Sequence, residues 1–160
     1  MGPADAAALA HFDVVLHPRG GDAEPGPPFH DERGIWPTLR PGGPRGITTG
    51  AGFDAALAAL DAFPRASTEP DGAFLWVGEG AGGRWQVDGN AWEREGRILS
   101  VDVRGRCPLG ELRRFLGLWR AEGERLLVEF VRAGVYVDEE TFLRHAVATG
   151  PDVREDRDRP

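Results

Sequence analysis

The residues best placed for covalent chemistry are Cys107 and Arg113, which lie six positions apart with Gly110 between them. They follow a predicted strand and open a predicted helix. A thiol at a helix N-terminus has a lowered pKa, so a Cys107 thiolate would attack phosphorus while backbone amides and Arg113 hold the oxyanion. The C-x-x-G-x-x-R spacing therefore indicates a possible anion-handling enzyme.

The context of this motif favours a structural interpretation instead. Pro108 lacks one amide donor that an anion loop would need, and Glu111 would place a carboxylate beside the bound anion. The two leucines of the motif also continue the apolar stripe of the following helix. We therefore expect Cys107 to be a small buried residue at a strand–helix junction. A cysteine-dependent phosphatase-like enzyme using Cys107 and Arg113 is kept as the alternative function.

A second chemical pattern is the glycine series Gly78, Gly80 and Gly83, which has the spacing of a dinucleotide-binding turn. Such a turn needs a helix after it, whose N-terminus binds the pyrophosphate. Here residues 84–93 alternate like a strand, and the chain contains no lysine to serve a nucleotide loop. The glycines therefore predict the tip of a hairpin, and we predict no cofactor.

Nitrogen and oxygen ligands for a metal ion occur together at His30, Asp31 and Glu32. The nearest other histidines, His11 and His17, would lie about 20 Å apart on one strand face, too far for one ion. We therefore expect solvated side chains and no metal site, with His30, Asp31 and Glu32 as the only candidates.

Binding rather than catalysis is indicated by Trp92. In a straight strand it faces away from Trp85 and shares its face with Asp88 and Asn90, which makes an aromatic platform flanked by carboxylate and amide groups. A bulge at Gly89–Asn90 would instead return Trp92 to the core.

Trp36 is a second aromatic residue expected to contact a partner. It lies in residues 34–39, the apolar middle of a segment rich in proline and glycine.

Composition limits the classes of function further. The 160 residues carry a net charge of −7, and all 19 basic residues are arginine, which excludes lysine Schiff bases and Walker-type phosphate loops. An acidic surface repels phosphate backbones, so no nucleic acid partner is predicted. A single cysteine excludes an internal disulfide, and no apolar run is long enough for a membrane span. We predict a cytoplasmic protein.

These residues must be positioned by a single α+β domain. Apolar spacing predicts a helix from residue 53 to 60 and another that begins at residue 108. Period-two alternation predicts strands at 73–79, 84–93 and 97–104, with a tight turn at Asp88–Gly89 as the alternative that splits the middle strand. Residues 126–131 and 135–137 form a predicted hairpin, and Asp138 is the expected N-cap of a last helix. The predicted fold is an antiparallel sheet, made of this three-strand meander and the hairpin, with two to three helices on one face.

The chain divides into three predicted regions. Residues 1–52 comprise a short helix, a short strand and a proline- and glycine-rich loop that is partly docked on the rest of the protein. Residues 53–148 form the α+β core, and residues 149–160 form a charged, disordered tail. The leading functional hypothesis is a non-enzymatic protein-interaction or regulatory module that offers the acidic, Trp-containing sheet face or the loop to a protein partner. A small-ligand binder on the same face, using Trp92, Asp88 and Asn90, is the third hypothesis.

Overall fold

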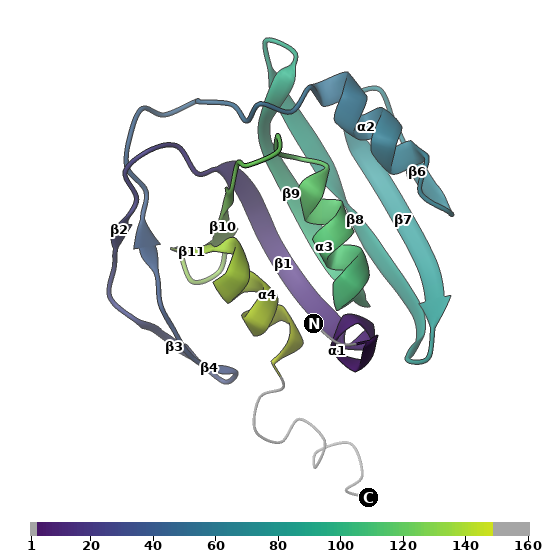
Figure 1. Cartoon of the computed structure of the whole chain (residues 1–160), viewed down its shortest axis with the longest axis horizontal. Helices are drawn as coiled ribbons and strands as arrows, with labels where there is room; N and C mark the ends of the chain where they lie inside the picture. The colour runs from purple at the N-terminus through teal and green to yellow at the C-terminus, as the bar shows by residue number, and fades with distance from the viewer. Residues whose placement is uncertain (1–2, 149–160) are drawn as a thin grey trace, which may run out of the picture.

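The computed structural model describes residues 3–148 of the chain (Figure 1). In this part of the chain the helices are α1 Pro3–Ala7, α2 Phe53–Asp61, α3 Leu109–Gly117 and α4 Glu139–Val147. The strands are β1 Leu9–Pro18, β2 Glu24–Pro25, β3 Phe29–Asp31, β4 Gly34–Trp36, β5 Leu39–Arg40, β6 Ala66–Thr68, β7 Ala73–Gly80, β8 Gly83–Arg94, β9 Arg97–Pro108, β10 Leu126–Phe130 and β11 Val135–Asp138. None of these helices has the length and apolar character needed to cross a membrane. The predicted tail at residues 149–160 lies outside the described residues.

Nine strands form one antiparallel sheet in the order β2-β5-β11-β10-β1-β9-β8-β7-β6, and β3 pairs with β4 separately. The predicted fold class, α+β with a mostly antiparallel sheet, is confirmed. The sheet is larger than the sequence predicts, because β1 pairs with β9 on one side and with β10 on the other. Residues before Phe53 therefore supply a central strand, and the core extends further toward the N-terminus than predicted.

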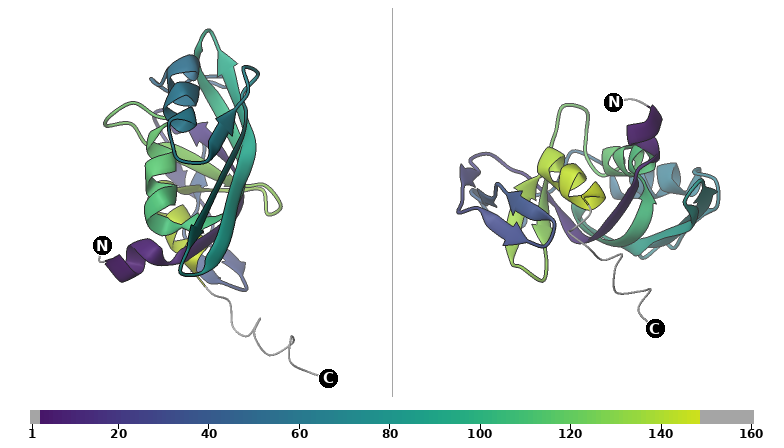
Figure 2. Two further views of the ribbon diagram at one scale, coloured as in Figure 1. Left: turned by 90° about the vertical axis from the view of Figure 1, so that its right-hand side faces the viewer. Right: turned by 90° about the horizontal axis from the view of Figure 1, so that it is seen from below.

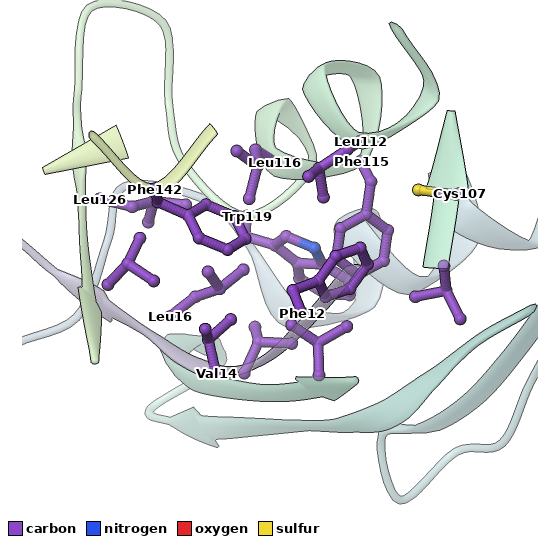
Figure 3. Packing of buried hydrophobic residues seen from close by; sticks show 14 of the residues in the cluster. Phe12, Val14, Leu16, Cys107, Leu112, Phe115, Leu116, Trp119, Leu126 and Phe142 are labelled. Carbon is purple, nitrogen blue, oxygen red and sulfur yellow. The ribbon is translucent and has the colours of Figure 1, made fainter. Parts of the chain in front are cut away.

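Helices α2, α3 and α4 pack on one face of the sheet, as Figures 1 and 2 show. Side chains alternate along each strand, so every second residue faces these helices. The apolar stripe of α3 meets β1 there, with Phe115, Trp119 and Leu16 all fully buried (Figure 3). The other fully buried strand residues of this layer include Val87, Ala91, Val101, Val128 and Val137.

Strand β8 runs unbroken past Gly89, which is paired with Val103 of β9. The alternative with a tight turn at Asp88–Gly89 is therefore wrong. The alternative with a bulge at Gly89–Asn90 is wrong as well, since the register shift lies between Trp92 and Glu93. Trp92 consequently keeps the alternation of a straight strand and stays on the face opposite Trp85.

The glycine series of residues 78–83 is a hairpin between β7 and β8, not a nucleotide turn. Gly83 has a φ of +95°, a conformation that favours glycine. A side chain at Gly78 would overlap the indole of Trp85, which in turn packs edge-on against Trp76 with ring centroids 4.8 Å apart. Gly78 is thus required by core packing.

The proline- and glycine-rich segment is tied to the sheet at several points. Leu39 of β5 pairs with Tyr136 of β11. Further along, the hydroxyl of Thr49 donates a hydrogen bond of 2.8 Å to the backbone carbonyl of Trp119, and Arg97 donates to the carbonyl of Gly50 at 2.9 Å. The segment therefore follows the margin of the sheet from β11 round to α2.

Candidate functional site

The face of the sheet opposite α2, α3 and α4 is here termed the open face (Figure 2). Its side chains come from alternate positions of the five longest neighbouring strands. On β7, β8 and β9 they include Leu75, Val77, Gln86, Asp88, Asn90, Trp92, Ser100, Asp102, Arg104 and Arg106, and on β1 and β10 they include His11, Asp13, Val15, His17 and Glu129. The structure thus places Trp92, Asp88 and Asn90 on one face, as the alternation predicts.

Trp92 is 50% exposed on the open face and its ring is hydrogen-bonded to a neighbouring strand. Its indole Nε1–H donates a hydrogen bond of 3.1 Å to Asp102 Oδ2, and its cross-strand neighbour is Ser100. A fixed, exposed indole loses little conformational entropy when a partner covers it. Leu75 of β7, 43% exposed, adds a second apolar group to this face.

The polar side chains near Trp92 already have hydrogen-bond or ion-pair partners within the protein. Asp88 Oδ2 accepts from the Arg104 guanidinium at 3.2 Å, so its charge is paired. Asn90 is half-buried and its amide donates to the backbone carbonyl of Ala91 at 2.9 Å. Asp102 is the residue that accepts the hydrogen bond of the Trp92 indole.

A cavity of about 670 Å³ lies between the open face and residues 41–47 of the proline- and glycine-rich segment. Ser100 lines this cavity and is also the cross-strand neighbour of Trp92, so the cavity adjoins the Trp92 platform. His17 and Tyr136 line it as well, and His17 Nε2 lies 2.8 Å from Glu129 Oε1. Burial raises the pKa of the Tyr136 phenol, and the nearby Glu129 carboxylate raises it further, against the opposite effect of Arg45.

His17 and Tyr136 lie together at this cavity with Glu129 hydrogen-bonded to His17, although no pattern in the sequence groups the three. The signal for His17 is the alternation of β1, in which Ala10, Phe12, Val14 and Leu16 are buried while His11, Asp13 and Val15 face the other way. No sequence signal links His17 to Glu129, because these residues are 112 positions apart.

Trp36 is not brought to the Trp92 platform. It lies in the β3–β4 hairpin beside α4, at the other end of the sheet from β7 and β8 (Figure 1). Its ring packs edge-on against His145 with centroids 5.0 Å apart, and its Nε1–H donates to Asp31 Oδ1 at 2.9 Å. Trp36 therefore holds the hairpin against the helix.

The candidate metal ligands His30, Asp31 and Glu32 do not converge. Asp31 is occupied by His145, whose Nε2 lies 2.6 Å from Oδ2, while His30 is exposed on the hairpin. Within residues 3–148, no group of three or more histidine, cysteine or acidic side chains is arranged to hold a metal ion.

Cys107 lies in the core and not at an anion loop. It is fully buried at the end of β9, where Figure 3 shows its sulfur turned toward the helical layer. Burial, with a smaller effect of the Glu111 carboxylate, raises the pKa of the Cys107 thiol to about 12. Pro108 is the N-cap of α3, and Arg113 reaches outward to Glu140 at 3.3 Å. The geometry therefore supports the structural interpretation of the motif.

Thiol modification provides a check on this interpretation. With a pKa of about 12, roughly one Cys107 in ten thousand is a thiolate at pH 8. We expect the native protein to react with an aromatic disulfide reagent at least a hundredfold more slowly than the urea-unfolded chain. Rapid reaction of the native protein near neutral pH would contradict the buried state and restore the enzyme hypothesis.

Comparison with protein-family models, with curated proteins and with solved structures finds no match to this chain. The open face brings together a hydrogen-bonded indole, an adjoining cavity and cross-strand charges.

Proposed function

We propose that this chain is a non-enzymatic protein-interaction module whose open face binds a partner protein, with Trp92 as the anchor. The observation that carries the proposal is the half-exposed indole held by Asp102. A tryptophan side chain offers about 150–250 Å² of surface, so covering the exposed half removes roughly 100 Å² from water. At about 25 cal/mol per Å², that burial contributes about 2–3 kcal/mol, typical of an interface hot spot.

The surroundings of Trp92 support this assignment. Interface hot spots combine a central aromatic group with polar neighbours that exclude water. Here Leu75 extends the apolar part of the face, and Asp13, Asp102 and Glu129 supply carboxylates. Near Trp92 these carboxylates are complementary to basic side chains of a partner, whereas Arg104 and Arg106 further along β9 are complementary to acidic ones. The proposal keeps the cytoplasmic location predicted from the sequence.

The cavity beneath residues 41–47 favours a second candidate function, the binding of a small ligand. Its volume of about 670 Å³ lies within the usual range for ligand sites, and His17, Ser100 and Tyr136 supply hydrogen-bonding groups. Such a ligand would contact the edge of the Trp92 platform through Ser100.

Site-specific photo-crosslinking tests the protein-interaction proposal. A photoreactive amino acid replaces Ser100 beside Trp92, and in a matched control it replaces Asp54 on the exposed side of α2. In lysate of the source cells, we expect a discrete cross-linked protein from position 100 alone. Excess unlabelled wild-type protein should compete for it, and the Trp92→Ala variant should not. Equal products from both positions, or equal competition by Trp92→Ala, would argue against the open face as the binding surface.

A further inference from the structure

A row of neighbouring residues crosses the open face at the end distant from the cavity beneath residues 41–47. The backbone N–H of Val77 donates to the carbonyl of Arg65 at 3.3 Å, Val77 pairs with Gln86, and Gln86 pairs with Arg106. Neighbouring strands lie about 4.8 Å apart, so the backbones of Arg65 and Arg106 are separated by about 14 Å. The backbones of Arg65 and Arg106 therefore flank the Val77–Gln86 pair.

These two arginines line a cavity of about 710 Å³ at the outer edge of β7. Arg84 also lines it, and the backbone carbonyl of Arg84 accepts a hydrogen bond of 3.0 Å from Arg106 Nη2. That bond anchors one nitrogen of the Arg106 guanidinium. Gly105, with a φ of +137°, lies in the wall of the cavity, where a Cβ atom would overlap the Gln86 carbonyl oxygen.

Three arginines and two carboxylates line this cavity, an excess of one positive charge, and the arginines without a carboxylate partner in the described part of the chain are Arg65 and Arg106. Its two carboxylates are each paired with an arginine, Glu79 with Arg84 and Asp88 with Arg104, both at 3.2 Å. Among residues 3–148, no carboxylate lies within ion-pair distance of Arg65 or Arg106. The site is therefore locally cationic on a chain whose net charge is −7.

The backbone of Arg65 has a φ of +59°, in the left-handed region that glycine occupies without strain. A glycine at this position would make the same turn from α2 into β6 at lower energetic cost. Strained backbone persists at sites where a particular side chain is used. Arg65 at this strained position lines the cavity.

We propose that this cavity binds a phosphate group, held from two sides by Arg65 and Arg106. A phosphate monoester carries a charge of about −1.5 to −2 near pH 7, which matches two guanidinium groups. Its oxygens accept paired hydrogen bonds from each guanidinium, whereas a single carboxylate is satisfied by one arginine. This site is centred on Arg65 and Arg106, shares Asp88 with the surroundings of Trp92, and does not rest on the proposed protein interaction.

The test measures binding of inorganic phosphate, glucose 6-phosphate, a phosphoserine peptide and its unphosphorylated twin to the whole chain at low salt. Arginine side-chain NMR signals and calorimetry report the binding. We expect all three phosphates to bind and the unphosphorylated peptide not to bind. Tighter binding of the sugar phosphate or of the phosphopeptide supports the site and identifies the source of the phosphate. Absence of binding by all of them overturns the proposal.

Two variants and a control connect the binding to this cavity. Arg65→Gly and Arg106→Gln should each weaken phosphate binding by about tenfold or more, because each removes charge-assisted hydrogen bonds. Arg125→Gln, an exposed arginine in the connection to β10, should leave the affinity unchanged. The Arg65→Gly variant should keep or raise the Tm, so its loss of binding cannot arise from unfolding. Unchanged affinity in both Arg65→Gly and Arg106→Gln overturns the assignment.

Discussion

Replacing Asp31 with alanine is expected to lower the free energy of unfolding by about 3 kcal/mol. The Asp31 carboxylate joins the β3–β4 hairpin to α4, since it meets His145 at 2.6 Å and accepts from Trp36 at 2.9 Å and from the Arg33 backbone at 3.0 Å. Both Asp31 and His145 have side chains only 14% exposed. Alanine would leave the His145 and Trp36 ring nitrogens without their acceptor. Urea denaturation measures the loss.

The Asp31→Asn variant separates the charge from the hydrogen bonds. Asparagine keeps an acceptor for Trp36, so we expect roughly half the loss in stability. Burial alone would raise the pKa of the Asp31 carboxyl, but hydrogen bonds from His145, Trp36 and Arg33 outweigh it and lower the pKa below its usual 3.8.

The lowered pKa gives the Asp31 contribution a defined pH dependence. A carboxyl with a lowered folded-state pKa contributes stability that is fully present above pH 3.8 and is lost as the pH falls through the folded pKa. The part of the acid slope due to this group should therefore vanish in Asp31→Asn. A wild-type slope in that variant, or an unchanged stability in Asp31→Ala, would show that the hairpin is held by other contacts.

Gly89→Ala should cost at least about 3 kcal/mol of stability, and the variant is expected to populate unfolded protein at moderate urea concentration. A Cβ atom at Gly89 would overlap the backbone carbonyl oxygen of Asp102 and come within 2.9 Å of the Phe74 ring. The first neighbour is backbone in β9 and the second is a buried core ring, so neither moves without disturbing the sheet. Thermal and urea denaturation followed by Trp fluorescence measure the effect.

Gly80→Ala is the matched control for this prediction, because a Cβ atom at Gly80 has nothing within 4 Å. It belongs to the same hairpin of β7 and β8, and its effect should stay within about 0.5 kcal/mol. A Gly89→Ala variant as stable as Gly80→Ala would mean that β8 and β9 are separated more widely at this point than described.

Local patterns in the sequence predict the elements of the fold better than their assembly. The stripe of α3 and the alternation of β9 follow from apolar spacing of 3.6 and 2, so both are recognised without tertiary information. Gly89 shows the limit of such patterns. After an aspartate it resembles a hairpin turn, whereas the structure needs it for close approach of the Asp102 carbonyl, a contact between different strands.

The central position of β1 could not be derived from the sequence either. Its neighbours β9 and β10 pair with it across separations of roughly 100 residues, and register between such segments is decided by tertiary packing. This placement brings His17 beside Glu129 and sets the floor of the cavity beneath residues 41–47. Proline and glycine indicate that residues 18–50 avoid long elements, but not that residues 41–47 lie beside the open face.

In the candidate site, too, local patterns predict which residues share a face, whereas contacts between strands are not predicted. Alternation along residues 84–93 correctly predicts that Trp92 shares a face with Asp88 and Asn90. It cannot predict that Asp102 holds the indole, because that contact depends on the register of β8 against β9 and on the bulge after Trp92. The sequence makes Asp31 a candidate metal ligand. In the structure its carboxylate instead joins the β3–β4 hairpin to α4.

We propose above that the open face binds a partner protein through Trp92. The most direct measurement is the calorimetric affinity of the partner identified by photo-crosslinking for wild type, Trp92→Ala and Trp92→Phe. We expect Trp92→Ala to bind about 30-fold more weakly or worse, which corresponds to a hot spot of about 2 kcal/mol. Trp92→Phe should lie between the two, and all three proteins should keep the same Tm within the small effect of a surface substitution. Equal affinity of wild type and Trp92→Ala would contradict the account.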